Sequence, residues 1–124
     1  MSEEIQRHFE RAADCIEDVQ VLLENDRFAA AVTRAYYAMF HAATAALLAA
    51  GIERSSHHGL LSAFGEHFVK TQRVDRKFFL YLREAFEQRQ QSDYDPLVDI
   101  DRQAVQEALD HAIDFVTVCR SLTE

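Results

Sequence analysis

The chain has 124 residues, and this length suits one compact domain over residues 1–124, because single domains commonly contain about 100–150 residues. Asp and Glu total 21 against 13 Lys and Arg, which gives a formal charge of −8. This balance excludes a protein that coats nucleic acid through many phosphate contacts, although a local basic site is compatible with it. Without a signal-like N-terminus, and with two cysteines outside any CxxC spacing, we expect reduced thiols and a cytoplasmic protein.

The first two predicted elements are long helices. Apolar residues at spacings of three and four predict a helix over about Ser2–Glu24, with Ser2 as its N-cap. A second helix is predicted over about Asp26–Ala50, ending before Gly51. It lacks charged residues after Arg34, yet it is too rich in alanine and polar groups for a membrane span, so no membrane partner is expected. A stripe of small residues places it at the centre of the fold: Ala35, Ala38, Ala42, Ala45 and Ala49.

Three further helices follow. The third begins at Ser55 or Ser56, with two glycines that reduce its regularity. The fourth is capped by Asp75 and ends near Tyr94, because a proline at position 96 disfavours helix at the preceding residue. The fifth is capped by Asp99 or Asp101. No segment alternates with the period of a strand, so the sequence predicts an all-α, up-and-down bundle of about five helices.

Arg34 and His41 form the first candidate site. They are seven residues apart on the second predicted helix and therefore share one face, together with Tyr37. A guanidinium can bind phosphate with two hydrogen bonds, and an imidazole titrates near neutral pH, so the pair could bind and act on a nucleotide or RNA. The structural alternative is a hydrogen-bonded histidine and an arginine paired with a carboxylate of another helix.

Arg89, Asp93 and Tyr94 form the second candidate site, in the text EQRQQSDYDP. Arg89 continues the apolar stripe of the fourth helix, and Asp93 lies four residues on, on the same face. The two are either part of a site or a simple ion pair along the helix. Tyr94 follows at the predicted end of the helix.

Two other clusters are weaker candidates. His57, His58 and His67 suggest a metal site, but no recognised ligand motif accompanies them, and we expect neither a metal nor another cofactor. The second cluster is a basic turn, which is either solvated or a contact for a phosphate backbone: Lys70, Arg73, Arg76 and Lys77.

The stretches RAYYAMFHAA and LREAFEQRQQSDYD, with SSHHGLLSAFGEHFVKT between them, resemble the small prokaryotic HEPN-domain proteins over nearly the whole chain. This resemblance implies a homodimeric all-α bundle, often encoded beside a minimal nucleotidyltransferase with which it forms a toxin and antitoxin pair. Toxic members resemble metal-independent ribonucleases with an R-x4-6-H motif from each protomer. The ribose 2′-hydroxyl attacks the adjacent phosphate while histidine moves protons and arginine stabilises charge.

Carried onto this chain, the resemblance matches Arg89 to the motif arginine, whereas Tyr94 stands where the histidine is expected. The motif is thus of an R-x4-Y form, and general-base catalysis by a histidine at that position is not supported. In some family pairs the nucleotidyltransferase adenylylates a tyrosine beside the motif, and Tyr94 is the matching position. The expected catalytic residues are Arg89, Asp93 and Tyr94.

Arg34, Tyr37 and His41 are the residues expected to bind a nucleotide or RNA. Three functions remain open at this point: a HEPN toxin with weak or partner-regulated endoribonuclease activity, a non-catalytic subunit that binds a nucleotide or docks a nucleotidyltransferase, and a structural dimer without chemistry. The first two require Arg34 and Arg89 to converge on one hollow.

Overall fold

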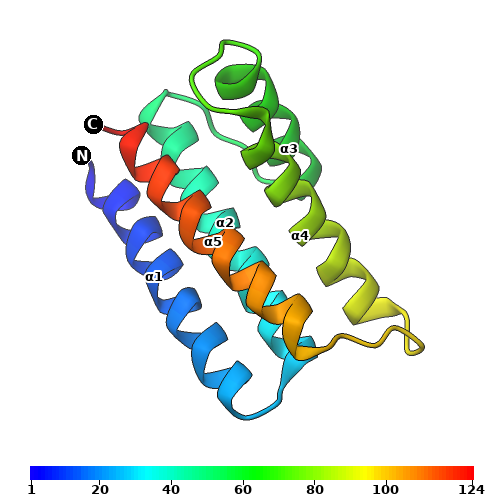
Figure 1. Cartoon of the computed structure of the whole chain (residues 1–124). Coiled ribbons are helices and arrows are strands. Elements are labelled where there is room, and N and C mark those ends of the chain that lie inside the picture. The colour runs from blue at the N-terminus through cyan, green and yellow to red at the C-terminus, as the bar shows by residue number, and fades with distance from the viewer.

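A computed structural model describes all residues, 1–124, and it is entirely helical. The long helices lie side by side and alternate in direction, so that both termini lie at the same end of the molecule (Figure 1). The prediction of an all-α, up-and-down bundle is confirmed. The elements are α1 (Glu3–Glu24), α2 (Phe28–Ala49), α3 (His57–Phe64), the short π-helix η1 (Gly65–Val69), α4 (Arg76–Tyr94) and α5 (Arg102–Ser121).

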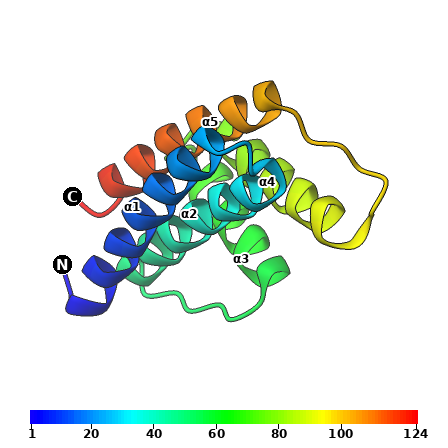
Figure 2. The same ribbon diagram turned by 90° about the horizontal axis from the view of Figure 1, so that it is seen from below.

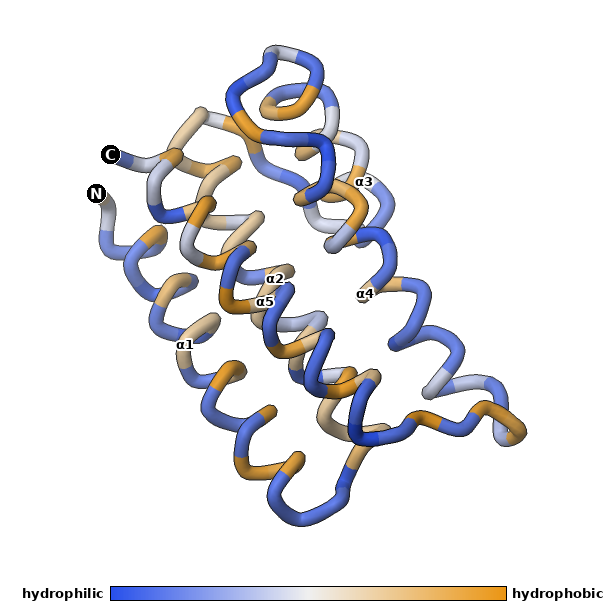
Figure 3. Tube along the Cα trace, in the orientation of Figure 1, coloured by the Kyte–Doolittle hydropathy of each residue, from blue (hydrophilic) through white to orange (hydrophobic).

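Helix α2 is the central element, because it contacts α1, α3, α4 and α5 (Figure 2). Of its alanine stripe, all but the terminal Ala49 are fully buried, so neighbouring helices approach its backbone closely. The buried residues form one cluster of 32 side chains without a polar or charged member. Along the chain, apolar and polar positions accordingly alternate with the turns of the helices (Figure 3). No helix has the length and apolar character that crossing a membrane requires.

The helix ends follow the predicted caps. The side chains of Ser2, Ser56, Asp75 and Asp101 each accept a hydrogen bond from a backbone N–H in the first turn of the following helix. Gly51 has a φ of +80°, the left-handed conformation expected just after a helix.

The start of α2 differs from the prediction. Asp26 has a φ of +57°, and the helix begins only at Phe28, without a side-chain cap. The Asp26 carboxylate instead pairs with Arg102, and this contact joins the turn between α1 and α2 to the first residue of α5. Asp26 therefore pairs with a residue far away in the sequence, and helix-capping preferences do not predict this contact.

Candidate functional site

One face of α2 remains partly open to solvent. Its residues follow the three-and-four spacing of a single helical face, and we call them the open stripe: Arg34, Tyr37, Phe40, His41, Thr44 and Leu48. Each of these side chains is only partly buried, whereas the alanines between them are buried. Arg34 and His41 therefore lie beside the core rather than inside it. Helix α1 borders the stripe on one side, and α3 and α4 border it on the other.

Arg34 projects from α2 towards α1. Its Nη2 donates a hydrogen bond to Sγ of Cys15 at 2.9 Å, and its Nε lies 3.4 Å from Oδ2 of Asp18. The side chain keeps 40% of its surface exposed, so the Asp18 pair is a weak, solvent-screened interaction. Burial raises the pKa of the Cys15 thiol, which therefore stays protonated beside the guanidinium.

Arg89 reaches the same region from α4. Its side chain is only 14% exposed, and its Nε lies 3.2 Å from Oδ2 of Asp93. The geometry of this ion pair is not that of a hydrogen bond, and the guanidinium makes no hydrogen bond within the chain. Its Cζ atom lies 5.8 Å from the centre of the Tyr36 ring and 5.7 Å from that of Tyr37.

The two arginines meet at the ring of Tyr37. Cζ of Arg34 lies 5.9 Å from the ring centre, and Cζ of Arg89 lies 5.7 Å from it. Cation–π contacts of this kind contribute about 0.5–2 kcal/mol and hold each guanidinium in place. The Nε atoms of both arginines are buried without a hydrogen-bond acceptor, although buried donors are almost always paired. The two guanidiniums thus approach one partly open ring, and each has a carboxylate nearby: Asp18 beside Arg34 and Asp93 beside Arg89.

His57 from α3 completes this group. Its Nδ1 shares a hydrogen bond with the hydroxyl of Tyr36, and its ring stacks on Phe86 with a centroid distance of 5.6 Å. Burial lowers its pKa, and the positive charge of Arg89 lowers it further. The pKa of Tyr36 is raised by burial, so its hydroxyl stays protonated. The residues around Tyr37 are named the Tyr37 cluster below: Arg34, Tyr36, Tyr37, His57 and Arg89.

His41 lies two turns along the open stripe, and its direct partner comes from α1. Nδ1 of His41 lies 3.1 Å from Nδ1 of His8, so one nitrogen donates and the other accepts. Burial, repulsion by His8 when that ring is protonated at low pH, and the positive charges of Arg11 and Arg34 together lower the pKa of His41 to about 4. Both histidines are therefore uncharged at neutral pH, and His41 shares the open stripe with Arg34 without a direct hydrogen bond to it.

The structure places the second predicted site partly at this surface. Asp93 accompanies Arg89, but Tyr94 is 76% exposed at the end of α4, and no hydrogen bond or ring contact joins it to the Tyr37 cluster. The basic turn ends in the first residues of α4, Arg76 and Lys77, so it lies about 20 Å along the helix from Arg89, at a rise of about 1.5 Å per residue. No group of three or more His, Cys, Asp or Glu side chains is arranged so that it could hold a metal ion.

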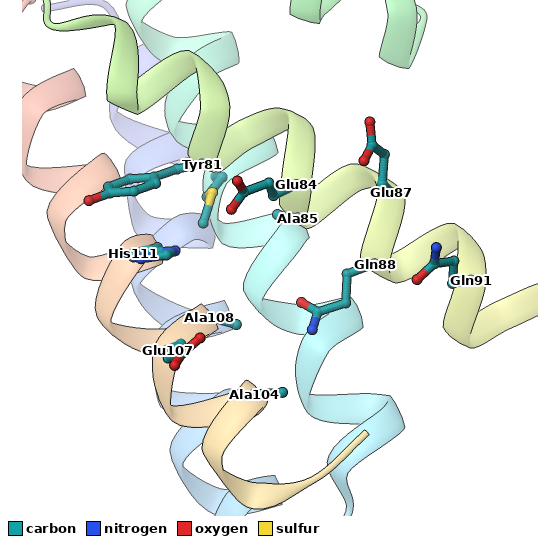
Figure 4. Close-up of a pocket in the computed structure, with 11 residues that line it drawn as sticks. Tyr81, Glu84, Ala85, Glu87, Gln88, Gln91, Ala104, Glu107, Ala108 and His111 are labelled. Carbon is teal, nitrogen blue, oxygen red and sulfur yellow. The ribbon is translucent and has the colours of Figure 1, made fainter. Parts of the chain in front are cut away.

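Two hollows flank this region, and neither Arg34 nor Arg89 lines either of them. One, with a volume of about 490 Å³, continues the open stripe towards the end of α2 and is lined by Phe40, Thr44, His8 and Arg54 among others. The other, of about 260 Å³, lies between α4 and α5 over Met39. Figure 4 shows Glu84 and Glu87 from α4 and Glu107 from α5 at this second hollow. Its acidic lining repels phosphate, so it does not suit a nucleic acid.

The sequence alone does not identify two members of the Tyr37 cluster as site residues. Tyr36 is a core residue by its pattern, and His57 was considered only as a metal ligand. His8 was missed too, although it lies seven residues before Cys15 just as His41 lies seven residues after Arg34. Because α1 and α2 run antiparallel, these equal spacings place His8 beside His41 and Cys15 beside Arg34. The matching spacing is therefore a signal in the sequence that could have identified His8.

The fold and the cluster define an all-α bundle with an arginine- and aromatic-lined surface beside its central helix. The HEPN domain matches residues 5–122, and the chain belongs to this family. It is 38% identical to a UPF0332 protein of Thermotoga maritima over 114 residues, which cover 92% of this chain and 86% of the relative. It is also 34% identical to the Methanocaldococcus jannaschii protein named "Putative toxin MJ0142" over 100 residues, 81% of this chain and 68% of that protein.

A second M. jannaschii protein, named "Putative toxin MJ0605", is 34% identical over 92 residues, which cover 74% of this chain and 69% of the relative. The resemblance inferred from the two sequence stretches is thus confirmed at the level of the family.

Proposed function

We propose that this protein is a HEPN toxin that binds RNA at the Tyr37 cluster and cleaves it without a metal ion, with activity that is weak or controlled by a partner. The observation that carries the proposal is the convergence of the Arg34 and Arg89 guanidiniums on the single ring of Tyr37. Two relatives that carry the name "Putative toxin" support the toxin role.

Each part of the cluster has a place in this chemistry. Arg89, which makes no hydrogen bond within the chain, can donate to the oxygens of one phosphate. Arg34, which is more exposed, can hold the same or the neighbouring phosphate. The Tyr37 ring offers a face on which an unpaired base can stack. When the 2′-oxygen attacks phosphorus, charge develops on the phosphate oxygens, and fixed guanidiniums stabilise it more in the transition state than in the ground state.

Partners are part of the proposal. A second copy of the chain is proposed as a homodimer partner, and a minimal nucleotidyltransferase as the antitoxin. Tyr94 and Leu97, which are 76% and 89% exposed at the end of α4 and just after it, provide an apolar surface for such contacts. In the dimer, the segment from Arg89 to Tyr94 of each protomer is proposed to contribute to the site, with Asp93 orienting Arg89.

The test is cleavage of a single-stranded RNA by the purified full-length protein. The proposal predicts products with 2′,3′-cyclic phosphate ends, and loss of about 10²-fold or more in rate for Arg89→Ala. Arg83→Ala is the matched control, because Arg83 also lies on α4 and pairs with a carboxylate four residues on, but it is 47% exposed and outside the cluster. Equal cleavage by the wild type and Arg89→Ala would rule out the proposed role.

A second candidate function is a non-catalytic subunit that binds a nucleotide or docks a nucleotidyltransferase. The exposure of Tyr94 favours it, since an acceptor of adenylylation must be reachable by another enzyme. Isothermal calorimetry with nucleotides and mass spectrometry of the protein isolated from its native cells test this role. An adenylyl group on Tyr94, together with no RNA cleavage, would favour the second function over the first.

A further inference from the structure

A histidine stands beside Arg89 in space, although none follows it at the motif spacing. His57 and Arg89 pack against the same two rings. The His57 ring centre lies 5.5 Å from that of Tyr36 and 6.3 Å from that of Tyr37, and Cζ of Arg89 lies 5.8 and 5.7 Å from them. Tyr94, which occupies the motif position, is 76% exposed and makes no contact with these rings.

The His57 ring is fixed in orientation. Ser56 caps α3 and places His57 in the first turn of that helix. Phe86 stacks on the ring at 5.6 Å, and Phe40 packs against it at 5.3 Å. Nδ1 is occupied by the hydroxyl of Tyr36, whereas Nε2 has no partner within the chain and the side chain is only partly buried. The free nitrogen of an oriented imidazole is thus available to a ligand at the cluster.

We propose that His57 is the general base of the cleavage reaction, an inference that rests on the function proposed above. The step requires the tautomer in which Nδ1–H donates to the Tyr36 oxygen, so that Nε2 carries the lone pair. This nitrogen takes the proton of the RNA 2′-hydroxyl while the 2′-oxygen forms its bond to phosphorus. The bond from phosphorus to the 5′-oxygen breaks, and that oxygen takes a proton from water. The hydroxide that remains receives the proton held by His57, and the neutral imidazole is restored.

The surroundings of His57 suit a base. Burial lowers its pKa, and Arg89 from α4 and His58 on its own helix lower it further, so the ring is neutral at neutral pH. Tyr36 and Tyr37 of α2 also face the ring, and burial raises the pKa of Tyr36, so its hydroxyl stays protonated. A neutral imidazole with a fixed hydrogen-bond partner is the form in which a histidine accepts a proton.

The experiment compares the wild type, His57→Gln and His57→Ala on a single-stranded RNA of mixed sequence. We expect both substitutions to reduce the cleavage rate by about 10²–10⁴-fold. Added imidazole should restore part of the activity of His57→Ala only. The wild-type rate should fall along an acid limb with a midpoint below pH 6.5, and His57→Gln should lack that limb. His58→Gln is the matched control, because the His58 side chain is exposed and lies outside the Tyr37 cluster. It should cleave at the wild-type rate at neutral pH, where His57 is already uncharged.

Binding of a 2′-O-methyl RNA, which has no 2′-hydroxyl proton, separates loss of chemistry from loss of folding. His57→Gln should bind this RNA with wild-type affinity. Cleavage by His57→Gln within threefold of the wild type would overturn the role of His57 and leave the proposed ribonuclease standing. Absence of cleavage by the wild type would instead overturn the proposed function, and the role of His57 with it.

Discussion

The pair of His8 and His41 makes the stability of the protein depend on pH. Burial lowers the pKa of His41 from 6.5 to about 4 in the folded chain, and it lowers the pKa of His8 as well. The folded state therefore disfavours a proton that the unfolded state accepts. The stabilisation is fully present above pH 6.5 and is lost as the pH falls from 6.5 towards 4.

The size of the effect follows from these values. A single histidine with a pKa of 6.5 unfolded and about 4 folded lowers the free energy of unfolding by roughly 1.4 kcal/mol between about pH 8 and pH 5.5. His41 is partly exposed, and solvent screening reduces this contribution to about 1 kcal/mol. His8 acts in the same direction and adds to the loss.

The assay is urea unfolding, followed by circular dichroism, at about pH 8 and about pH 5.5 for the wild type and His41→Gln. Titration of the carboxylates is common to both proteins, so the difference between them isolates the histidine. His41→Gln should lose about 1 kcal/mol less stability than the wild type over this range. His58→Gln, whose side chain is exposed, should behave as the wild type does. Identical pH dependence for the wild type and His41→Gln would refute the reasoning.

Three substitutions test the fold. Ala42→Leu inserts a large side chain at a fully buried position of α2 and should lower the free energy of unfolding, measured in urea, by about 1–3 kcal/mol. Ala49→Leu, at the exposed end of the same stripe, should change that free energy by less than about 0.5 kcal/mol. Ser56→Ala removes the N-cap of α3 and should cost about 1 kcal/mol in the same assay, with Ser55→Ala as an unaffected control. Gly51→Ala should lower the free energy of unfolding by about 1–2 kcal/mol and lower the melting temperature, because a φ of +80° strains any residue other than glycine. A clash is not the cause, since no atom lies within 4 Å of an added Cβ. An unchanged melting temperature would contradict this explanation.

The helices were predictable because their signals are local. Apolar spacing and capping side chains lie within one element, and Ser2, Asp75 and Asp101 cap the helices that their positions predict. The π-helical turn that begins at Gly65 was not predictable in this way. There, the ring of Phe79 of α4 packs closely on Gly65, where an added Cβ would lie 3.4 Å from it, and this contact between distant parts of the chain has no local signal in the sequence.

The candidate site was predictable only in part. Periodicity placed Arg34, Tyr37 and His41 on one face of α2, and the structure has them on the open stripe. Periodicity identifies the face of a helix, but it does not show which residue of another helix meets that face. The approach of His57 depends on the path of the loop before α3, and the approach of Arg89 depends on the register of α4 against α2. Neither the path of that loop nor the register of α4 can be predicted from a local sequence pattern.

The central claim is that Arg34 and Arg89 serve one anion site at Tyr37, and a double-mutant cycle in binding tests it most directly. The affinity of a 2′-O-methyl RNA is measured for the wild type, Arg34→Ala, Arg89→Ala and the double variant. Because both guanidiniums lie within 6 Å of the same ring, the two losses should be coupled by about 0.5 kcal/mol or more. Strictly additive losses, or full affinity in the double variant, would mean that the two arginines do not share a ligand.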